Sequence, residues 1–316
     1  MNTLKDVVGI GNAIVDVLFR VDPSFLSRHH LTKGSMTLVD AGRASTIYSA
    51  AKDTTQISGG SVGNTMAGIA HLGGTGSYIG KVSNDNLGGL FRKDLESLGI
   101  RFSGQPSTNN SPTACCLVMI TPDGERTMAT FLGACTELIP EDVIPEIVSH
   151  HQITYLEGYL WDAPLAQESM VKAASIAKAS NRQVALTLSD SFCVDRHRQT
   201  FKDLIGNYVD LLFSNEDEIL SLYQQDEIES ALPLARSICD IVIVTRGAKG
   251  SLIATETETL KIDAVPVNQV IDTTGAGDLF AAGFLFGFTH GCGINESAKI
   301  GSAMAAEVIS HVGARP

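Results

Sequence analysis

The chain has 316 residues, of which 44% are hydrophobic and 18% are charged. This balance is typical of a globular protein with one or two large cores, and it excludes a disordered chain. Asp and Glu outnumber Lys and Arg by 35 to 23, so the formal net charge is −12. A field of that sign repels phosphate backbones, and we therefore expect no nucleic-acid partner.

Targeting and redox features indicate a cytoplasmic protein. The N-terminal sequence, MNTLKDVVGIGN, has no charged segment followed by a long apolar one, and the apolar segment 279–288 is too short to cross a membrane. We expect neither a signal peptide nor a membrane span. The six cysteines contain no C-x-x-C pair, which favours reduced, buried thiols over disulfides or a bound metal.

The N-terminal part alternates short apolar runs with helical patterns. A short apolar run is typical of a buried strand, whereas apolar residues spaced three and four apart indicate a helix. The predicted elements are, in chain order, strand 7–10, helix 61–72, strand 77–80 and helix 87–98.

Two further segments of this part do not fit that series. Within residues 14–21, apolar side chains lie on one side of an extended chain and Asp16 and Arg20 on the other. Residues 113–131 form a predicted hairpin around a T-P-D-G turn. We expect a small antiparallel sheet, a lid or second lobe of about residues 14–58 and 102–132, inserted into one domain that spans residues 1–316.

From residue 153 onward, strands and helices alternate regularly. Such a series places its strands in a parallel sheet with helices on both faces, which predicts the α/β class. The predicted elements are strand 153–156, helix 164–180, strand 184–188, helix 196–207, strand 211–213, helix 216–223 and strand 241–245.

The strongest chemical signal is the segment 272–278, D-T-T-G-A-G-D, which leads directly into an apolar helix. A glycine-rich turn at a helix N-terminus directs backbone amides and the positive end of the helix dipole at one point, where phosphate can bind. Asp278, in the first helical turn, can simply be favoured by that dipole. Beside a bound phosphate, its carboxylate can also accept the proton of an attacking alcohol, and the whole motif favours this second role.

Two other nucleotide-binding classes are excluded. Residues 80–82, G-K-V, lack the first glycine and the final Ser or Thr of a P-loop. Residues 9–11, G-I-G, begin a dinucleotide fingerprint but Ile14 replaces its third glycine, and a strand pattern follows instead of a helix.

The string DTTGAGDLFAAGF resembles the second signature of the ribokinase-like, or phosphofructokinase-B (PfkB) type, carbohydrate and nucleoside kinases. Residues 59–64, G-G-S-V-G-N, resemble the first, and the likeness runs from residues 9–12 to residues 313–316. The strings GNAIVD, TPDGERTM and LEGYLWD are similar to bacterial adenosine-kinase-like members. The resemblance implies a three-layer α/β/α ribokinase-like fold with a mainly parallel central sheet and a small β-sheet lid.

For the transferred phosphoryl group, the resemblance implies a catalytic base at Asp278 and an anion hole formed by the amides of Gly275, Ala276 and Gly277. It also implies that Arg126, on the hairpin, reaches the phosphates when the lid closes. An arginine after D-G-E is otherwise simply solvated.

On the acceptor side, the resemblance assigns sugar hydroxyls to short carboxylate, amide and glycine positions. Without the resemblance, Asp16 would be interpreted as a solvent-facing residue of a half-exposed strand. Apolar contacts to a purine are expected from Met36, Leu38, Cys115, Leu117 and Leu132. The residues that match acceptor-binding positions are Asn12, Asp16, Gly59, Gly60 and Asn64.

On the nucleotide side, the resemblance assigns Asn215 to ATP and Glu218 to Mg²⁺ and its water shell. Asn at an N-cap with Glu three residues later is also a capping box, and both interpretations can hold together. The T-x-G-x-x-G turn formed by Thr245, Gly247 and Gly250 would line the nucleotide phosphates and ribose. Its alternative is an ordinary hairpin turn.

The expected reaction is ATP- and Mg²⁺-dependent transfer of the γ-phosphoryl group to a primary hydroxyl, with the adenosine 5′-OH as the first choice of acceptor and AMP as its product. The alternatives are a kinase for ribose, fructose or a related sugar, a kinase for inosine or guanosine, and a non-catalytic nucleoside- or sugar-binding protein. The alternatives also include a K⁺ ion bound near Asp272 and Thr274, and either a monomer or a homodimer.

Overall fold

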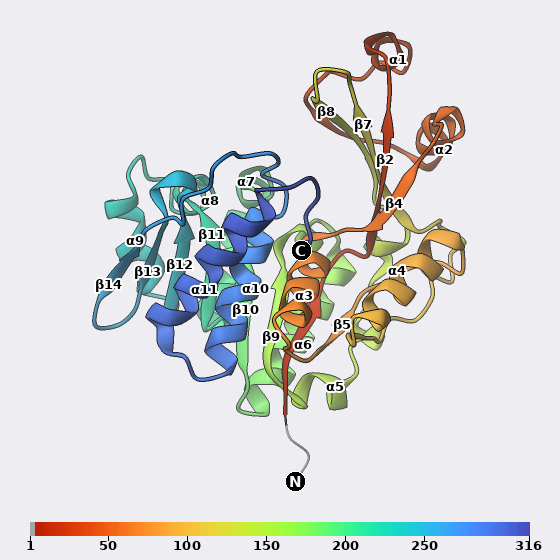
Figure 1. Cartoon of the computed structure of the whole chain (residues 1–316). Coiled ribbons are helices and arrows are strands. Elements are labelled where there is room, and N and C mark those ends of the chain that lie inside the picture. Colours follow the sequence, from red (N-terminus) through yellow and green to blue (C-terminus); the bar gives the residue numbers. More distant parts are fainter. Residues whose placement is uncertain (1–3) are drawn as a thin grey trace.

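In the computed structural model, which describes residues 4–316, the chain forms two β-sheets (Figure 1). The larger sheet has nine strands, and the seven from β12 to β6 in sheet order run parallel to one another. β13 and β14 extend it as antiparallel strands. In sheet order the strands are β14 (Thr259–Ile262), β13 (Ser251–Ala254), β12 (Ile241–Thr245), β11 (Leu211–Asn215), β10 (Gln183–Thr187), β9 (His151–Glu157), β1 (Lys5–Ile10), β5 (Gly76–Ile79) and β6 (Arg101–Phe102).

Helices cover both faces of the larger sheet, because alternate side chains of its strands point to opposite sides. Val7 of β1 packs with the first helical layer, and Val8 packs with the second. The first layer consists of α3 (Ser61–His71), α4 (Asn86–Ser97), α10 (Ala276–Thr289) and α11 (Gly293–Val308). The second consists of α5 (Pro145–Ser149), α6 (Pro164–Ala179), α7 (Ser191–Tyr208), α8 (Glu216–Tyr223) and α9 (Ile228–Arg236). The three-layer prediction is confirmed.

The second sheet rises from the carboxyl ends of the parallel strands (Figure 1). The expectation of an antiparallel sheet is wrong in part: β2 pairs with β7, and β3 with β8, in parallel. The reason is that β1 and β6, the strands that precede β2 and β7 in the chain, run parallel and end on the same side of the larger sheet, so β2 and β7 leave that side in the same direction. Its strands, in order, are β3 (Met36–Leu38), β8 (Arg126–Phe131), β7 (Ala114–Ile120), β2 (Ile14–Arg20) and β4 (Thr55–Ser58).

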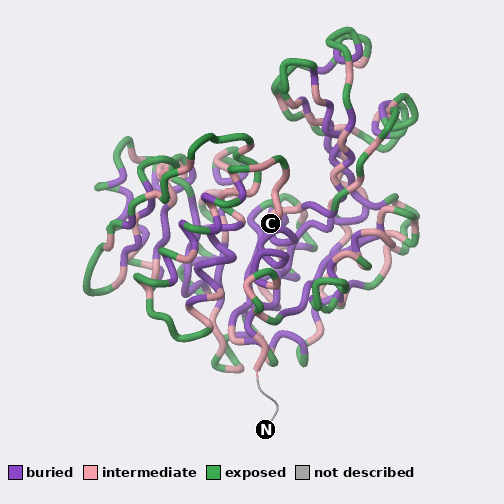
Figure 2. Tube along the Cα trace, viewed as in Figure 1, coloured by how far each residue is buried: buried purple, intermediate pink, exposed green. Residues whose placement is uncertain are grey.

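Only one face of the second sheet is covered by helices of the described chain, α1 (Pro23–Arg28) and α2 (Ala41–Ala50). Its core side chains, including Val15 and Leu117, are fully buried beneath them. On the other face Met36 and Leu38 are 53% and 58% exposed. Figure 2 shows exposed residues around the end of this sheet and buried ones along its strands.

This alternation corrects two of the expected purine contacts. Cys115 and Leu117 belong to the covered face. Cys116 is paired in register with Asp16, and Val118 lies two residues further along the same face. A ligand lying against the open face would therefore meet Cys116 and Val118.

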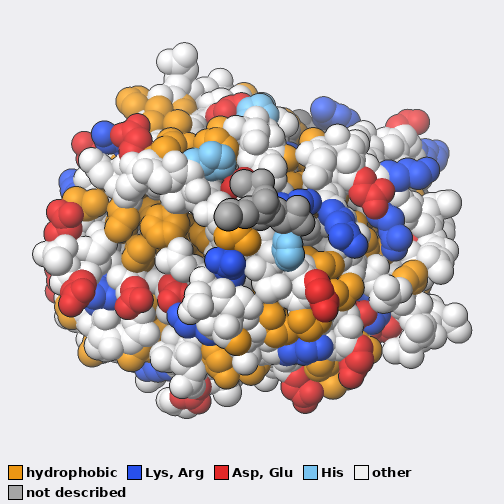
Figure 3. All heavy atoms as spheres, turned by 90° about the horizontal axis from the view of Figure 1, so that it is seen from below, with side chains coloured by type: hydrophobic (Ala, Val, Ile, Leu, Met, Phe, Trp, Pro, Cys, Tyr) orange, Lys and Arg blue, Asp and Glu red, His pale blue; other side chains and the backbone are white. Residues whose placement is uncertain are grey.

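The opposite end of the molecule lies around the amino ends of the parallel strands. Seen from that end, positive and negative side chains are interspersed (Figure 3). All six cysteines are free and five are buried. Within residues 4–316, no helix has the length and apolarity required to traverse a bilayer.

Candidate active site

Asp278 lies in the first turn of α10, at the carboxyl edge of the larger sheet, and two side chains of α3 hold its carboxylate. Ser61 Oγ donates to Asp278 Oδ1 at 2.6 Å, and Asn64 Nδ2 donates to Oδ2 at 3.0 Å. Burial raises the pKa of Asp278 to about 6, while these hydrogen bonds and the charge of Arg315 oppose the rise. The carboxylate is therefore held in a fixed position and can take up a proton near neutral pH.

The glycine turn before α10 has the geometry of an anion site. Gly275 has a φ of 80°, and a Cβ there would lie 2.7 Å from the Ala314 carbonyl oxygen, so no larger residue fits. The Ala276 amide donates to the Thr273 carbonyl at 3.2 Å. Within residues 4–316, the Gly275 and Gly277 amides have no such acceptor, which leaves two of the three expected donors free for a ligand.

The acceptor-side residues meet next to Asp278. Asp16, on β2, lies against the loop before α3, because a Cβ at Gly59 would be 2.7 Å from Asp16 Oδ2. Burial raises the pKa of Asp16 to about 6, and the charges of Arg315 and Arg126 oppose that rise. Gly60 caps α3 with a φ of 80°. The second sheet and the larger sheet therefore both contribute side chains to one polar site.

Glu157, at the end of β9, supports this site from below and was not singled out in the sequence. Its carboxylate accepts from Asn12 Nδ2 at 2.8 Å and from the Val62 amide at 3.0 Å. Glu157 is 1% exposed. Burial raises its pKa to about 7. It thus joins the loop after β1 to the N-terminus of α3, and the only signal for it was its place in the string LEGYLWD.

Arg126, at the start of β8, contacts the anion turn directly. Its Nη1 lies 2.8 Å from Asp272 Oδ2 and 3.5 Å from Thr274 Oγ1. The Asp272 carboxylate also accepts from the amides of Thr274 and Gly313. The second sheet is therefore joined by an ion pair to the segment that carries the glycine turn, and Arg126 is not simply solvated.

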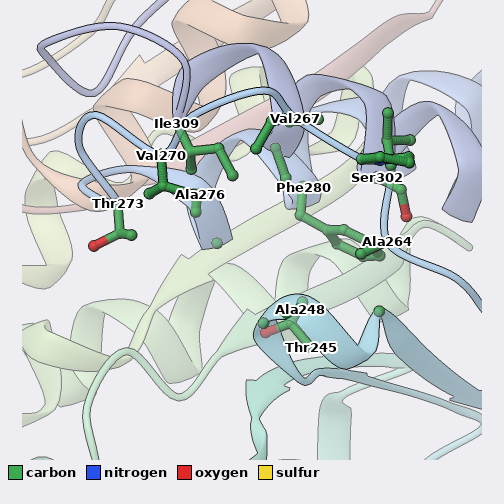
Figure 4. Close-up of a pocket in the computed structure, with 17 residues that line it drawn as sticks. Thr245, Ala248, Ala264, Val267, Val270, Thr273, Ala276, Phe280, Ser302 and Ile309 are labelled. Atoms are coloured by element: carbon green, nitrogen blue, oxygen red, sulfur yellow. The ribbon is translucent and has the colours of Figure 1, made fainter.

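A cavity of about 610 Å³ lies beside the glycine turn. Of the predicted nucleotide residues, Thr245, Gly247 and Gly250 line it, together with Ala276 and Gly277. Figure 4 shows Phe280 of α10 and Ile309, which follows α11, on one side of the cavity and Thr245 and Ala248 on the opposite side. Most of its remaining lining, from residues 264–270 and α11, was not predicted.

Asn215 and Glu218 are not among the residues that line this cavity. They form the expected capping box: Glu218 N donates to Asn215 Oδ1 at 2.8 Å, and Asn215 N donates to Glu218 Oε2 at 3.0 Å. Burial, followed by the charges of Asp190, Asp217 and Asp278, raises the pKa of Glu218 to about 7. No group of three or more potential metal ligands occurs within residues 4–316.

The fold and the site define a small-molecule kinase: a carboxylate, an anion-binding turn and a polar acceptor site lie at the carboxyl edge of a parallel sheet. A family model described as pfkB family carbohydrate kinase matches residues 34–316. The chain belongs to this family and is a phosphotransferase that uses an alcohol group as acceptor. Kinases of this family use ATP with Mg²⁺.

The similar proteins are named as kinases of different nucleosides. The crystal structure of adenosine kinase from Sinorhizobium meliloti is 46% identical, covers 99% of this chain and 96% of that chain, and gives a TM-score of 0.91. Adenosine kinase of Saccharomyces cerevisiae is 25% identical over 332 residues, 97% of this chain and 95% of the relative. Guanosine-inosine kinase of Escherichia coli is 29% identical over 269 residues, which are 80% of this chain and 60% of the relative.

Proposed function

We propose that the protein is an adenosine kinase, which transfers the γ-phosphoryl group of ATP to the 5′-hydroxyl of adenosine and releases AMP and ADP. The observation that carries the proposal is the position of Asp278, held by Ser61 and Asn64 between the glycine turn and the acceptor-side residues. The similarity to the Sinorhizobium meliloti adenosine kinase supports adenosine as the acceptor.

Asp278 is the general base in this proposal. As the O5′ oxygen bonds to the γ-phosphorus, the O5′–H proton passes to the Asp278 carboxylate and the bond from phosphorus to the β,γ-bridging oxygen breaks. Hydrogen bonds from Ser61 and Asn64 keep this carboxylate in place, so it does not have to reorganise during the transfer. Its pKa of about 6 still lies below neutral pH, so the carboxylate is mostly ionised there, and the rise makes it a stronger base than a solvent-exposed carboxylate.

The acceptor lies, in this proposal, between the loop before α3 and the open face of the second sheet. Asp16 accepts hydrogen bonds from the ribose hydroxyls, and Asn12, Gly59, Gly60 and Asn64 complete the pocket for the sugar. The exposed apolar side chains of the open face, Met36 and Leu38, supply contact area for the purine. This pocket combines a polar sugar site with an apolar base site, as a nucleoside requires.

The phosphates of ATP lie at the glycine turn, and its base and ribose occupy the neighbouring cavity. The Gly275 and Gly277 amides, for which residues 4–316 provide no hydrogen-bond acceptor, donate to the transferred group in this proposal. Thr245, Gly247 and Gly250 line the same cavity. Asn215 is assigned to ATP as well, from the end of β11, the strand that pairs with β12.

Magnesium is implied by the family, and the residues present fit it. Glu218 is 6% exposed, and the neighbouring Asp190 and Asp217 add negative charge. A cation close to this carboxylate favours its ionised form, and Mg²⁺ retains several waters, so one carboxylate is sufficient. We assign the water shell of the ion to Glu218; the bound ion supplies positive charge that neutralises the phosphates.

The second sheet acts as a lid in this proposal, formed by about residues 14–58 and 102–132. The two lid segments of the chain enter their sheet with β2 at Ile14 and with β7 at Ala114. The earlier strand β6 (Arg101–Phe102) is not part of the lid sheet, because it pairs with β5 in the larger sheet. Arg126 now pairs with Asp272. When phosphate is bound beside Asp272, the guanidinium can exchange this carboxylate for phosphate oxygens and hold the lid closed.

The experiment is an acceptor panel scored by kcat/KM with ATP and Mg²⁺. Adenosine should exceed inosine, guanosine, ribose and fructose, each by about tenfold or more. A sugar that exceeds adenosine by tenfold would replace the acceptor and leave the kinase class intact. If no acceptor is phosphorylated although one stabilises the protein in a thermal-shift assay, the non-catalytic binding protein becomes the better description.

A further inference from the structure

Arg315 lies inside the site although it comes from the segment that follows α11. Its side chain is only 12% exposed. Figure 1 shows the C-terminal end of the chain beside α3, below the second sheet. The guanidinium bonds to Asp94 of α4 at 2.5 Å and lies 3.4 Å from the Gly59 carbonyl oxygen. It therefore joins the C-terminal segment to two helices and to the acceptor loop.

The contact that matters for catalysis runs through Asn64. Arg315 Nε donates to Asn64 Oδ1 at 3.1 Å, and Asn64 Nδ2 donates in turn to Asp278 Oδ2 at 3.0 Å. An arginine has only donors, so it fixes the oxygen of the amide on its own side and the nitrogen on the side of Asp278. Without it, a flipped amide would place an oxygen against the carboxylate.

The charge of Arg315 acts on the same groups. It lowers the pKa of Asp278 and, as the first of two arginines, that of Asp16. The other titratable groups whose charges couple with Asp278 are acidic or neutral at pH 7, so Arg315 is the cation that acts on Asp278 itself, whereas Asp16 is also under the charge of Arg126. These titratable groups are Asp16 of β2, Tyr155 and Glu157 of β9, Tyr159 of the turn after β9, and Glu218 of α8.

We propose that Arg315 is a positioning residue for phosphoryl transfer, which orients the Asn64 amide toward the general base Asp278 and supplies the positive charge next to it. Arg315 acts through Asn64 and touches no reacting atom. The inference rests on the proposed function for the role of Asp278, and it adds a residue outside both family signatures.

The central variant is Arg315→Gln. We expect kcat to fall about tenfold, as is usual when a residue that supports a catalytic group is lost, with a smaller change in the KM for ATP. The acid limb of the kcat/KM profile should move to higher pH by on the order of 1 unit, because an opposite charge beside Asp278 is removed. The exposed Arg101→Gln variant, which loses the same charge elsewhere, should behave as wild type.

Two further variants separate the two contributions. Arg315→Lys keeps a positive charge but cannot reproduce the planar fork, so it should restore the wild-type pH profile and leave kcat low. On the alkaline plateau of the pH profile, where Asp278 is fully ionised and the charge of Arg315 no longer sets its protonation, adding Arg315→Gln to Asn64→Ala should lower kcat by less than twofold further. Losses that multiply in the double variant, or a kcat for Arg315→Gln within twofold of wild type, would overturn the proposal.

A readout without turnover keeps this inference separate from the acceptor assignment. ¹³C NMR of Asp side-chain carboxyls, with the Asp278 signal assigned by its loss in Asp278→Asn, reports the pKa of Asp278 in wild type and in Arg315→Gln. A higher pKa in the variant supports the link even if adenosine is the wrong acceptor. An unchanged pKa refutes it even if adenosine is the right one.

Discussion

The acceptor side and the nucleotide side of the site are built from different materials. On the acceptor side, the side chains of Ser61, Asn64, Asp278 and Arg315 form a connected hydrogen-bond network, and the Asp16 carboxylate lies against the neighbouring Gly59. On the nucleotide side, the cavity is lined by glycine, alanine, valine and proline, with Phe280 and a few hydroxyl groups. The two regions meet at the glycine turn of residues 273–277.

This difference indicates where selectivity resides. A pocket that hydrogen-bonds a ligand rejects an analogue lacking the matching group, because its own polar groups are then left unpaired. An apolar pocket discriminates mainly by size. The sugar of the acceptor should therefore be chosen strictly and the base of the phosphate donor more loosely, and the following changes test this contrast.

The largest effect is expected for Asp278→Asn. Asn has nearly the same volume and can still occupy the first turn of a helix, so the free energy of unfolding should change by no more than about 1 kcal/mol. Proton acceptance is lost, so kcat should fall about a hundredfold or more. Single-turnover kinetics together with thermal melting measure both. A folded variant with above about a third of wild-type turnover would show that Asp278 only stabilises the helix.

A smaller effect is expected for Asp16→Asn, which tests selectivity on the acceptor side. If the Asp16 carboxylate accepts hydrogen bonds from the ribose hydroxyls, as proposed, the substitution should lower kcat/KM for the nucleoside about 10- to 100-fold. The KM for ATP should stay within twofold, because Asp16 is not among the residues of the nucleotide cavity. Equal losses for both substrates would mean that the acidic residue supports the fold and not the sugar.

Arg126→Ala should reduce kcat about tenfold, with little change in the KM for the acceptor, because the guanidinium is proposed to contact phosphate only when the lid is closed. Arg126→Lys should restore little of this loss, since the planar fork is absent. Asp272→Asn breaks the same ion pair but keeps the arginine, so its kcat is compared with that of Arg126→Ala. Wild-type activity in Arg126→Ala would leave the ion pair as its only role.

The pH dependence should reflect the ionisation of the base. The pKa of Asp278 is raised to about 6, so the carboxylate is mostly ionised at pH 7 and mostly protonated at pH 5. A base must be ionised to act, and kcat/KM should therefore fall about tenfold between pH 7 and pH 5. A rate that is level down to pH 5, in a protein that remains folded, would contradict the role of Asp278.

The smallest effect is expected on exchange of the donor base. GTP should support phosphorylation with a kcat/KM within about tenfold of that for ATP, because the apolar cavity offers few hydrogen-bond partners to any base. The comparison is made at saturating acceptor. A preference for ATP of a thousandfold would show that the contrast between the two sides does not hold.

Most of the fold could be predicted because its elements are periodic and end at turn residues. The strand 241–245 and the helix 216–223 match β12 and α8 residue for residue. The parallel pairing of β2 with β7 could not be predicted, because it depends on where two distant segments leave the larger sheet. Local alternation identifies a strand but not its neighbour.

The candidate site shows the same limit. Asp278 and the glycine turn stand in one continuous motif and could be found directly. Glu157 and Arg315 are single residues whose partners, Asn12 and Asn64, lie more than a hundred positions away. The small residues of α11 that line the nucleotide cavity carry no chemical signal of their own, because small residues equally allow close helix packing.

Four acidic side chains of the site also couple folding to proton binding. Asp16, Glu157, Glu218 and Asp278 have pKa values raised to about 6 or 7, above those of the unfolded chain. Between about pH 4.5 and pH 7, the ligand-free folded protein therefore holds more protons than the unfolded one. The contribution of these groups to the free energy of unfolding falls as pH rises through this range. A cation held beside Glu218 would displace those protons, so binding of the cation and uptake of acid oppose each other.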